Sequence, residues 1–279
     1  MSRARVTRNR AGDSAVVRIA LIGTALVLAV LLFGAPLAMV FSRAFALGAR
    51  VYAEKIGDPF TLHAIWLTVL TSLVVLPINT GFGLAAAWAI TRHDFPGKRL
   101  LTTLIELPVS ISPIVAGVAY LFLYGALGLF GPLLGELGWR IMFTVPAIFL
   151  VSLFVTSPYV ARELITVMQS QGSDEDQAAI SLGAGGFATF MRVTLPNIRW
   201  ALFHGVVLCN ARVMGEFGAV SVVSGKIRGV TETLPLHIEV LFNDYNATGA
   251  FAAASILALL ALVTLVLKTI SEWRLSRDG

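Results

Sequence analysis

Six long apolar stretches, separated by short polar segments, dominate the pattern of the chain. They lie at residues 16–41, 62–90, 100–125, 143–168, 198–222 and 248–268. Each is long enough to supply the roughly 20 apolar residues that a helix needs to cross a hydrocarbon core. Several contain proline, which membrane helices tolerate because neighbouring helices satisfy the freed backbone groups, so we expect kinked helices. The pattern predicts an all-α, polytopic membrane protein with about six transmembrane helices.

Composition supports this class, because 57% of the residues are hydrophobic and 13% are charged. Soluble domains average about 45–50% apolar and 25% charged residues. The net charge of +5 does not indicate nucleic-acid binding, since the basic residues lie between the apolar stretches and not in one patch. The single cysteine, Cys209, excludes an internal disulfide framework and a cysteine-rich metal site. We expect no cofactor, no metal and no nucleic-acid partner.

Basic residues are distributed unequally between the two sides of this membrane domain. Fourteen lie on one side: Arg3, Arg5, Arg8, Arg10, Arg18, Arg92, Lys98, Arg99, Arg162, Arg192, Arg199, Lys268, Arg274 and Arg277. Six lie on the other: Arg43, Arg50, Lys55, Arg140, Lys226 and Arg228. Because positive charge is retained in the cytoplasm, the asymmetry and an even number of spans place both termini there.

No linker or low-complexity tract divides the chain, so we expect one membrane domain with short tails. We assign residues 1–15 to a cytoplasmic N-terminal tail, 16–60 to the first transmembrane helix and an extracytoplasmic loop, 61–268 to the membrane core, and 269–279 to a cytoplasmic C-terminal tail. Ala44 and Ala46 form a small-residue pattern like that of a signal-peptide cleavage site. The apolar run before them is longer than a usual signal core, which favours a retained anchor.

The longest cytoplasmic connection, about residues 169–197, has the clearest local signals. Gly172 interrupts the incoming helix, and Ser173 precedes three acidic residues with the spacing of an N-cap and capping box. Gly183 suits a helix end or tight turn, and Pro196 suits the first turn of the next membrane helix. The segment predicts a short helix near 173–183 on the cytoplasmic surface. A plain interfacial connector is the alternative interpretation.

The spacing within this connection resembles the EAA loop of ABC importer permeases, E-A-A-x3-G-x9-I-x-L-P. The matching residues are Gln177, Ala178, Ala179, Gly183, Val193, Leu195 and Pro196. Gln177 replaces the family glutamate and Val193 the isoleucine. The resemblance implies that the short helix docks onto a cytoplasmic ATPase and transmits its nucleotide-driven closure to the membrane helices.

Most of the chain after about residue 60 is similar to the sulfate/thiosulfate branch of these permeases, the CysW type. The similarity is clearest in residues 210–225, 231–236 and 243–245. Molybdate and tungstate permeases share the pattern Arg-x3-Glu-Phe-Gly and remain the alternative. The resemblance implies the type I importer (MetI-like) fold and a bacterial inner-membrane location. It also implies a second permease, of CysT type, two copies of an ATP-binding subunit and an extracytoplasmic sulfate-binding protein.

Asn210, Arg212 and Glu216 are the candidates for the substrate path or gate. Charges within a span cost about 2.5–3.5 kcal/mol each on insertion scales, so they need compensation. Arg212 and Glu216 are four residues apart and can pair on one helix face. A structural ion pair and direct lining of an anion path both explain them. For Gly215 and Gly218 we favour helix packing.

Other polar residues give weaker signals. Glu106 lies either on a transport path or at the hydrated interface. We interpret His204 as an interfacial side chain, because no second ligand stands at metal spacing beside it. His63 and His93 lie where loops meet helices. His237 and Glu239 lack the spacing of a zinc motif, and we expect them on a solvated extracytoplasmic face.

Two other function classes are less well supported. An intramembrane enzyme would need a motif such as H-E-x-x-H or G-x-S-x-G, and the sequence contains neither. A self-contained channel or secondary transporter would show inverted repeats or a repeated filter sequence. The sequence also has no G-x4-G-K-[ST] loop for ATP. We therefore expect a non-catalytic transport subunit whose ATP is hydrolysed by a partner chain.

Overall fold

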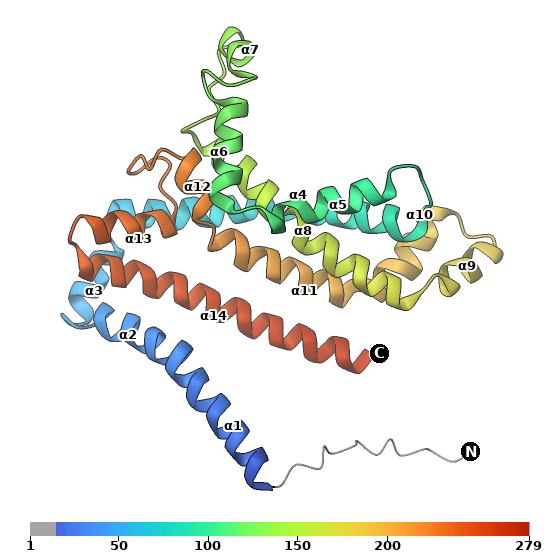
Figure 1. Ribbon diagram of the computed structural model, residues 1–279, viewed down its shortest axis with the longest axis horizontal. Helices are drawn as coiled ribbons and strands as arrows, with labels where there is room; N and C mark the ends of the chain where they lie inside the picture. Colours follow the sequence, from blue (N-terminus) through green and yellow to red (C-terminus); the bar gives the residue numbers. More distant parts are fainter. Residues whose placement is uncertain (1–14, 279) are drawn as a thin grey trace.

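The structure, a computed structural model, describes the backbone of residues 15–278 and the side chains of residues 16–270 (Figure 1). The described residues form helices and loops, with no strand among them, which confirms the all-α class. The N-terminal tail lies outside the described residues except for Ala15. So do six of the basic side chains used to predict orientation: Arg3, Arg5, Arg8, Arg10, Arg274 and Arg277.

Sixteen helical segments follow one another within the described residues. In chain order they are α1 (Ala15–Ala29), the π-helical turn η1 (Val30–Gly34), α2 (Ala35–Ala44), α3 (Ala49–Ile56), α4 (Pro59–Arg92), α5 (Lys98–Ser110), α6 (Pro113–Tyr124), α7 (Gly131–Glu136), α8 (Val145–Gln171), α9 (Asp174–Ser181), α10 (Gly186–Thr189), the π-helical turn η2 (Phe190–Thr194), α11 (Leu195–Met214), α12 (Gly218–Val223), α13 (Leu234–Asn243) and α14 (Ala247–Asp278).

Four of the described helical stretches are long and apolar enough to cross a membrane unaided. They are Val16–Ala44, Pro59–Arg92, Val145–Gln171 and Ala247–Ile270. These match the first, second, fourth and sixth apolar stretches of the sequence. The helix continues through Pro77 in α4 and through Pro158 in α8.

The third apolar stretch is two helices and not one. α5 ends at Ser110, and α6 begins at Pro113 after a bend of 111° (Figure 1). Proline disfavours the helical conformation in the residue before it, and Ser112 accordingly has ψ 134°. The kink expected in this proline-containing stretch is thus a full break between two helices. α6 leaves the bundle, with α7 at its tip (Figure 1).

The fifth stretch, 198–222, is also divided. α11 ends at Met214, and the short α12 begins at Gly218. α11 has 20 residues, about 30 Å of helix, and packs against α8, α14 and α4. The six apolar stretches are thus four long helices and two interrupted ones, which agrees with a polytopic permease-like bundle.

α8 lies at the centre of the bundle, in contact with α4, α11 and α5. It packs closely against α4 at Gly83, where an added Cβ would lie 2.8 Å from the Cβ of Val160. A side chain at position 83 would therefore force the two helices apart. Around this contact a buried apolar cluster includes Val75, Leu164 and Ile198.

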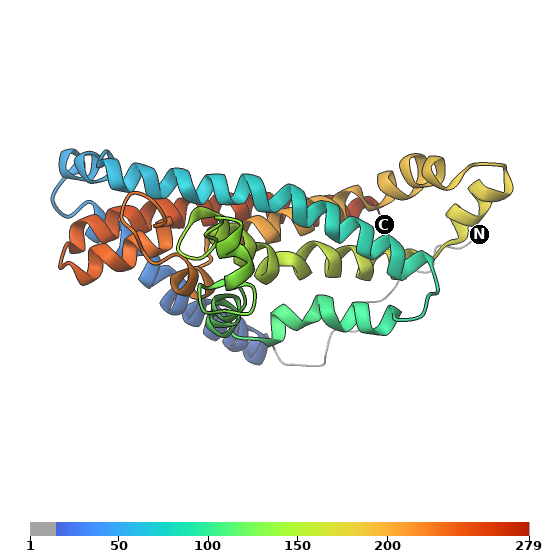
Figure 2. The same cartoon turned by 90° about the horizontal axis from the view of Figure 1, so that it is seen from above.

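The bundle is elongated, and its two ends carry different elements. α3, α13 and the loop between α12 and α13 lie at one end, whereas α9 and α10 project from the other (Figures 1 and 2). α4 runs most of the distance between them (Figure 2). The bundle therefore presents one surface at the α9 end and a separate one at the α13 end.

Candidate functional site

The EAA-like residues are contiguous at the α9 end of the bundle. Gln177, Ala178 and Ala179 are on α9, Gly183 is in the turn that follows, and Val193 is in η2. Leu195 and Pro196 begin α11. Three large apolar side chains on this surface are exposed: Ile180 at 58%, Leu182 at 90% and Phe187 at 76%. We call α9, α10 and the turn between them the coupling surface.

The start of α9 differs from the expected capping box. Ser173 is the N-cap residue, but its side chain accepts no bond from the helix backbone. Instead, the Gln177 amide donates to the Ser173 hydroxyl across 2.7 Å. The prediction of a capping box was therefore wrong. The Ser173 hydroxyl accepts a hydrogen bond from a side chain four residues later and not from a backbone N–H.

The turn after α9 requires glycine for a backbone reason. Gly183 has φ +90°, a conformation that side chains with a Cβ rarely adopt. An added Cβ would meet nothing within 4 Å, so space is not the constraint. The positive φ that the sequence suggested at this position is confirmed.

A buried ion pair attaches α9 to the end of α4. The Nε of Arg92 lies 2.6 Å from an oxygen of Asp176. The hydroxyl of Thr194 donates to the other oxygen of Asp176 across 2.7 Å. Asp176 is only 6% exposed. Three segments distant in sequence therefore meet at one carboxylate.

This junction was not predicted from the sequence. Arg92 contributed only to the predicted orientation, and Asp176 only to the acidic first turn of the short helix. The one available signal was that Asp176 is the third acidic residue in a row, on a different side of the short helix from its neighbours. Nothing local indicated that Arg92, 84 positions earlier, would be its partner.

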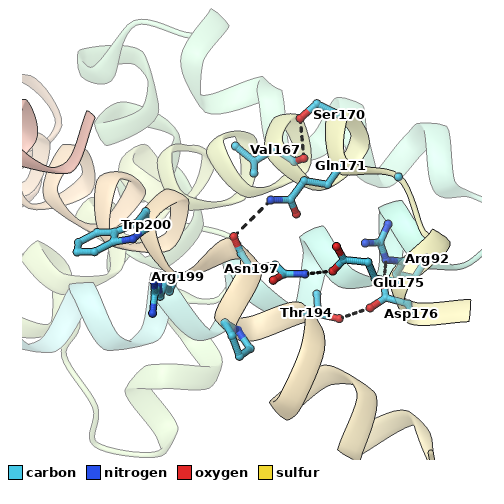
Figure 3. A pocket seen from close by; sticks show the side chains of 12 residues that line it. Arg92, Val167, Ser170, Gln171, Glu175, Asp176, Thr194, Asn197, Arg199 and Trp200 are labelled. Carbon is cyan, nitrogen blue, oxygen red and sulfur yellow. Dashed lines mark hydrogen bonds and ion pairs between the residues drawn. The ribbon is translucent and has the colours of Figure 1, made fainter. Parts of the chain in front are cut away.

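A cavity of about 640 Å³ lies beside the junction, between the end of α8 and the start of α11 (Figure 3). Gln171 donates to the carbonyl of Asn197 across 3.3 Å, and the Asn197 amide donates to Glu175. Polar side chains therefore attach α9 directly to α4 and to the start of α11, and Asn197 attaches the start of α11 to the end of α8.

The predicted intramembrane pair is present where α11 meets α12. Arg212 Nη1 lies 2.7 Å from Glu216 Oε2, and Glu216 is 2% exposed. The other Glu216 oxygen accepts the backbone N–H of Ala219 across 3.0 Å. The carboxylate thus joins α11 to the first turn of α12. Asn210 lies nearby on α11 and accepts a hydrogen bond from Ser72 of α4.

The two glycines beside this pair differ. A Cβ on Gly218 would lie 3.1 Å from the Cβ of Pro113, so α12 packs closely on the start of α6. A Cβ on Gly215 would approach only the carbonyl of Ala211, in its own helix, at 3.4 Å. Within this chain the packing interpretation therefore holds for Gly218 and not for Gly215.

Two histidine expectations are corrected by the structure. His204 is 9% exposed, and its Nδ1 lies 2.8 Å from Glu163 of α8, so it is a buried paired side chain and not an interfacial one. His237 is 1% exposed and not solvated. Both helices turn these residues towards neighbouring helices, which sequence spacing did not reveal. Glu239 is on the outer face, paired with Lys226 at 2.7 Å.

The remaining candidates lie near helix ends or on outer faces. His63 is in the first turns of α4, and His93 follows its last residue, as expected. Glu106 is exposed on α5. Within residues 16–270 no group of three or more His, Cys, Asp or Glu side chains could hold a metal ion.

Comparison with known proteins identifies the family. Residues 79–277 match the family described as the binding-protein-dependent transport system inner membrane component. The chain is 52% identical over 258 residues to the sulfate transport system permease protein CysW of Escherichia coli (strain K12), covering 92% of this chain and 89% of that protein. It is 32% identical over 244 residues to the permease protein CysT of the same organism, covering 88% of each.

The fold has a match among solved structures. A bacterial alginate ABC transporter, crystallised in complex with an alginate-bound periplasmic protein, matches with a TM-score of 0.74 over 91% of this chain and 92% of that one. Their sequence identity is 17%, so the likeness concerns the fold alone. The family match and the identity to CysW show that the chain belongs to the binding-protein-dependent transport system inner membrane components, the permease subunits of ABC importers.

Proposed function

We propose that this chain is the permease subunit of an ATP-driven importer that carries sulfate, with thiosulfate as a companion substrate, into a bacterial cell. The observation that carries the proposal is 52% identity to a sulfate permease across 92% of the chain. At that identity the similarity extends through the helices that would line a path, and not only through the family motif.

The proposed assembly contains a second permease, two copies of an ATP-binding subunit and an extracytoplasmic sulfate-binding protein. The exposed Ile180, Leu182 and Phe187 support docking of an ATP-binding subunit on the coupling surface. The 32% identity to CysT supports a homologous permease as partner. α6 leaves the bundle and exposes Phe122 at 72%, which suits contact with that partner. ATP hydrolysis belongs to the ATP-binding subunits.

The proposed location is the inner membrane, with both termini and the coupling surface in the cytoplasm. The asymmetry of fourteen basic residues against six supports this orientation. The α13 end then faces the binding protein. Residues 61–268 act as the permease core, and 16–60 as an additional helix with its loop.

For Arg212 and Glu216 we propose a structural role beside the path. Both oxygens of the Glu216 carboxylate have partners, one in Arg212 and one in the backbone of α12. A fully paired carboxylate neutralises Arg212 and leaves no dense cationic trap, which suits release of a divalent anion. Asn210 and Ser72 supply neutral hydrogen-bonding groups where α11 meets α4.

Uptake of radiolabelled sulfate tests the proposal. Cells that lack this chain should lose uptake and regain it when the wild-type gene is restored. An excess of unlabelled thiosulfate should compete, whereas molybdate should compete poorly. Unchanged sulfate uptake in the deletion strain, or competition by molybdate at lower concentration than by thiosulfate, would refute the proposed substrate.

A further inference from the structure

A buried polar cluster joins α13 to the first turns of α4. The Nε2 of His237 lies 3.0 Å from the hydroxyl oxygen of Thr61, and its Nδ1 lies 3.1 Å from an oxygen of Glu232. His237 and Glu232 are each 1% exposed, and Thr61 is 3% exposed. Burying three polar side chains at this end of the bundle is costly unless they are paired, so the cluster holds its segments in one arrangement.

The loop before α13 is closed on itself and attached to the same helix. Thr231 donates to the carbonyl of Ser224 across 2.6 Å and accepts the N–H of Ile227. The N–H of Leu234 donates to the hydroxyl of Thr68 on α4 across 2.8 Å. We call residues 224–233 the outer loop. It leads into α13, whose Leu234 and His237 contact two threonines of α4 that are two turns apart, and its Glu232 contacts His237.

Charged side chains, among them Arg228 of the outer loop, line a surface pocket at this end of the bundle. This pocket has a volume of about 470 Å³, and Thr61 and His237 form part of its lining. Arg228 pairs with Asp244 at 2.7 Å on its rim, and both side chains are about half exposed. Exposed charges of both signs around a polar depression suit reversible contact with a soluble protein, where charge complementarity sets partner choice and association rate.

α4 connects this cluster to the coupling surface without interruption. It carries Thr61 in its first turn and Arg92 as its last residue. These residues are 31 positions apart, roughly 46 Å along a helix. Arg92 holds Asp176 of α9. α4 runs most of the length of the bundle (Figure 2). A buried polar junction lies near each of its ends.

We infer that Thr61, His237 and Glu232 are positioning residues that transmit docking of the extracytoplasmic binding protein on the outer loop to α4, and through Arg92 to α9. The inference rests on the proposed function. It requires α4 to shift as a body, because its two ends are joined by one helical backbone and each end is held by directional polar contacts.

The experiment uses the full importer reconstituted in lipid nanodiscs, with purified binding protein titrated in the presence of sulfate. ATP hydrolysis is measured without and with binding protein, and their ratio at saturation is the readout. Thr61→Val, which loses the bond to His237, should lower the ratio about two- to ten-fold, the range expected from one hydrogen bond. Glu232→Gln, which replaces a charged acceptor of the His237 Nδ1–H by a neutral one, should lower the ratio by a smaller factor. Thr61→Ser, which keeps the hydroxyl, should restore it.

Thr264→Val is the matched control, because Thr264 is a buried threonine whose hydroxyl bonds only its own helix, at Ala261. It should leave the ratio unchanged. A cluster that only shapes the docking surface would change the half-saturating concentration of binding protein and not the maximal ratio. If Thr61→Val does not assemble, Glu232→Gln, which conserves the shape of the side chain, tests the inference by the same ratio.

A double-mutant cycle tests transmission along α4. Thr61→Val combined with Asp176→Asn should be non-additive in the logarithm of the ratio, although sites so far apart normally act independently. Additive effects, a wild-type ratio in Thr61→Val and Glu232→Gln, or an equal loss in Thr264→Val would each overturn the inference. Sulfate import by the same purified wild-type complex, reconstituted in closed lipid vesicles, tests the proposed function separately.

Discussion

Neutralising Asp176 should loosen α9 from the membrane helices. Asp176→Asn keeps an oxygen that can accept from Thr194 but removes the charge paired with Arg92. The two side chains are 8% and 11% exposed, and breaking a buried pair typically costs about 3–5 kcal/mol. Arg92 borders the 640 Å³ cavity, so water can reach it and the loss should be near the lower limit, about 3 kcal/mol.

Hydrogen exchange of the α9 amides measures this loss. About 3 kcal/mol corresponds to a roughly hundredfold larger open population, because about 1.4 kcal/mol is a factor of ten. Exchange should therefore accelerate by about two orders of magnitude in α9. Import per ATP hydrolysed should fall in parallel, since the coupling surface no longer moves with α4.

Asp174→Asn is the matched control. It removes the same charge from the same first turn of α9, so the interaction with the helix dipole changes equally, but Asp174 is exposed. Equal exchange rates in the two variants would refute the argument. So would normal protection in Asp176→Asn. Joint replacement by Arg92→Met and Asp176→Leu should recover most of the protection, because neither buried charge is then left alone.

Three further predictions use the same assays. Gly183→Val should leave the protein inserted but lower import per ATP, because φ +90° strains a β-branched residue by about 1–2 kcal/mol or more. Gly183→Asn should have a milder effect. Normal coupling in Gly183→Val would show that the turn has no role. Arg212→Leu and Glu216→Leu should each lower the amount of assembled complex on size-exclusion chromatography. The double variant should recover most of that amount, although it still lacks the bond to Ala219, worth roughly 1 kcal/mol. Additive losses would show that the pair does not interact. Cysteines placed at Ser2 and Ser276 in a Cys209→Ala background should resist an impermeant thiol reagent in intact cells, and labelling of either would reverse the proposed topology.

Features that depend on neighbouring residues could be predicted from the sequence. The four long membrane helices follow from the length and hydropathy of their own segments. The positive φ of Gly183 and the short helix before it follow from the spacing of turn and start signals within about ten residues. The pairing of Arg212 with Glu216 follows from four-residue spacing on a helix.

Features that depend on which helix faces meet could not be predicted from the sequence. The junction of Arg92 with Asp176 joins positions 84 apart, and the burial of His237 depends on α13 packing against α4 and α14. The break before Pro113 had a local signal, yet its 111° angle depends on where α6 packs against α12. Hydropathy and backbone preference act over short distances, so the membrane class, the long helices and the local turns follow from the chain itself. Which polar side chains are buried together depends on the packing of distant helices, because a charge or imidazole is paired or solvated according to the surface that lies opposite it.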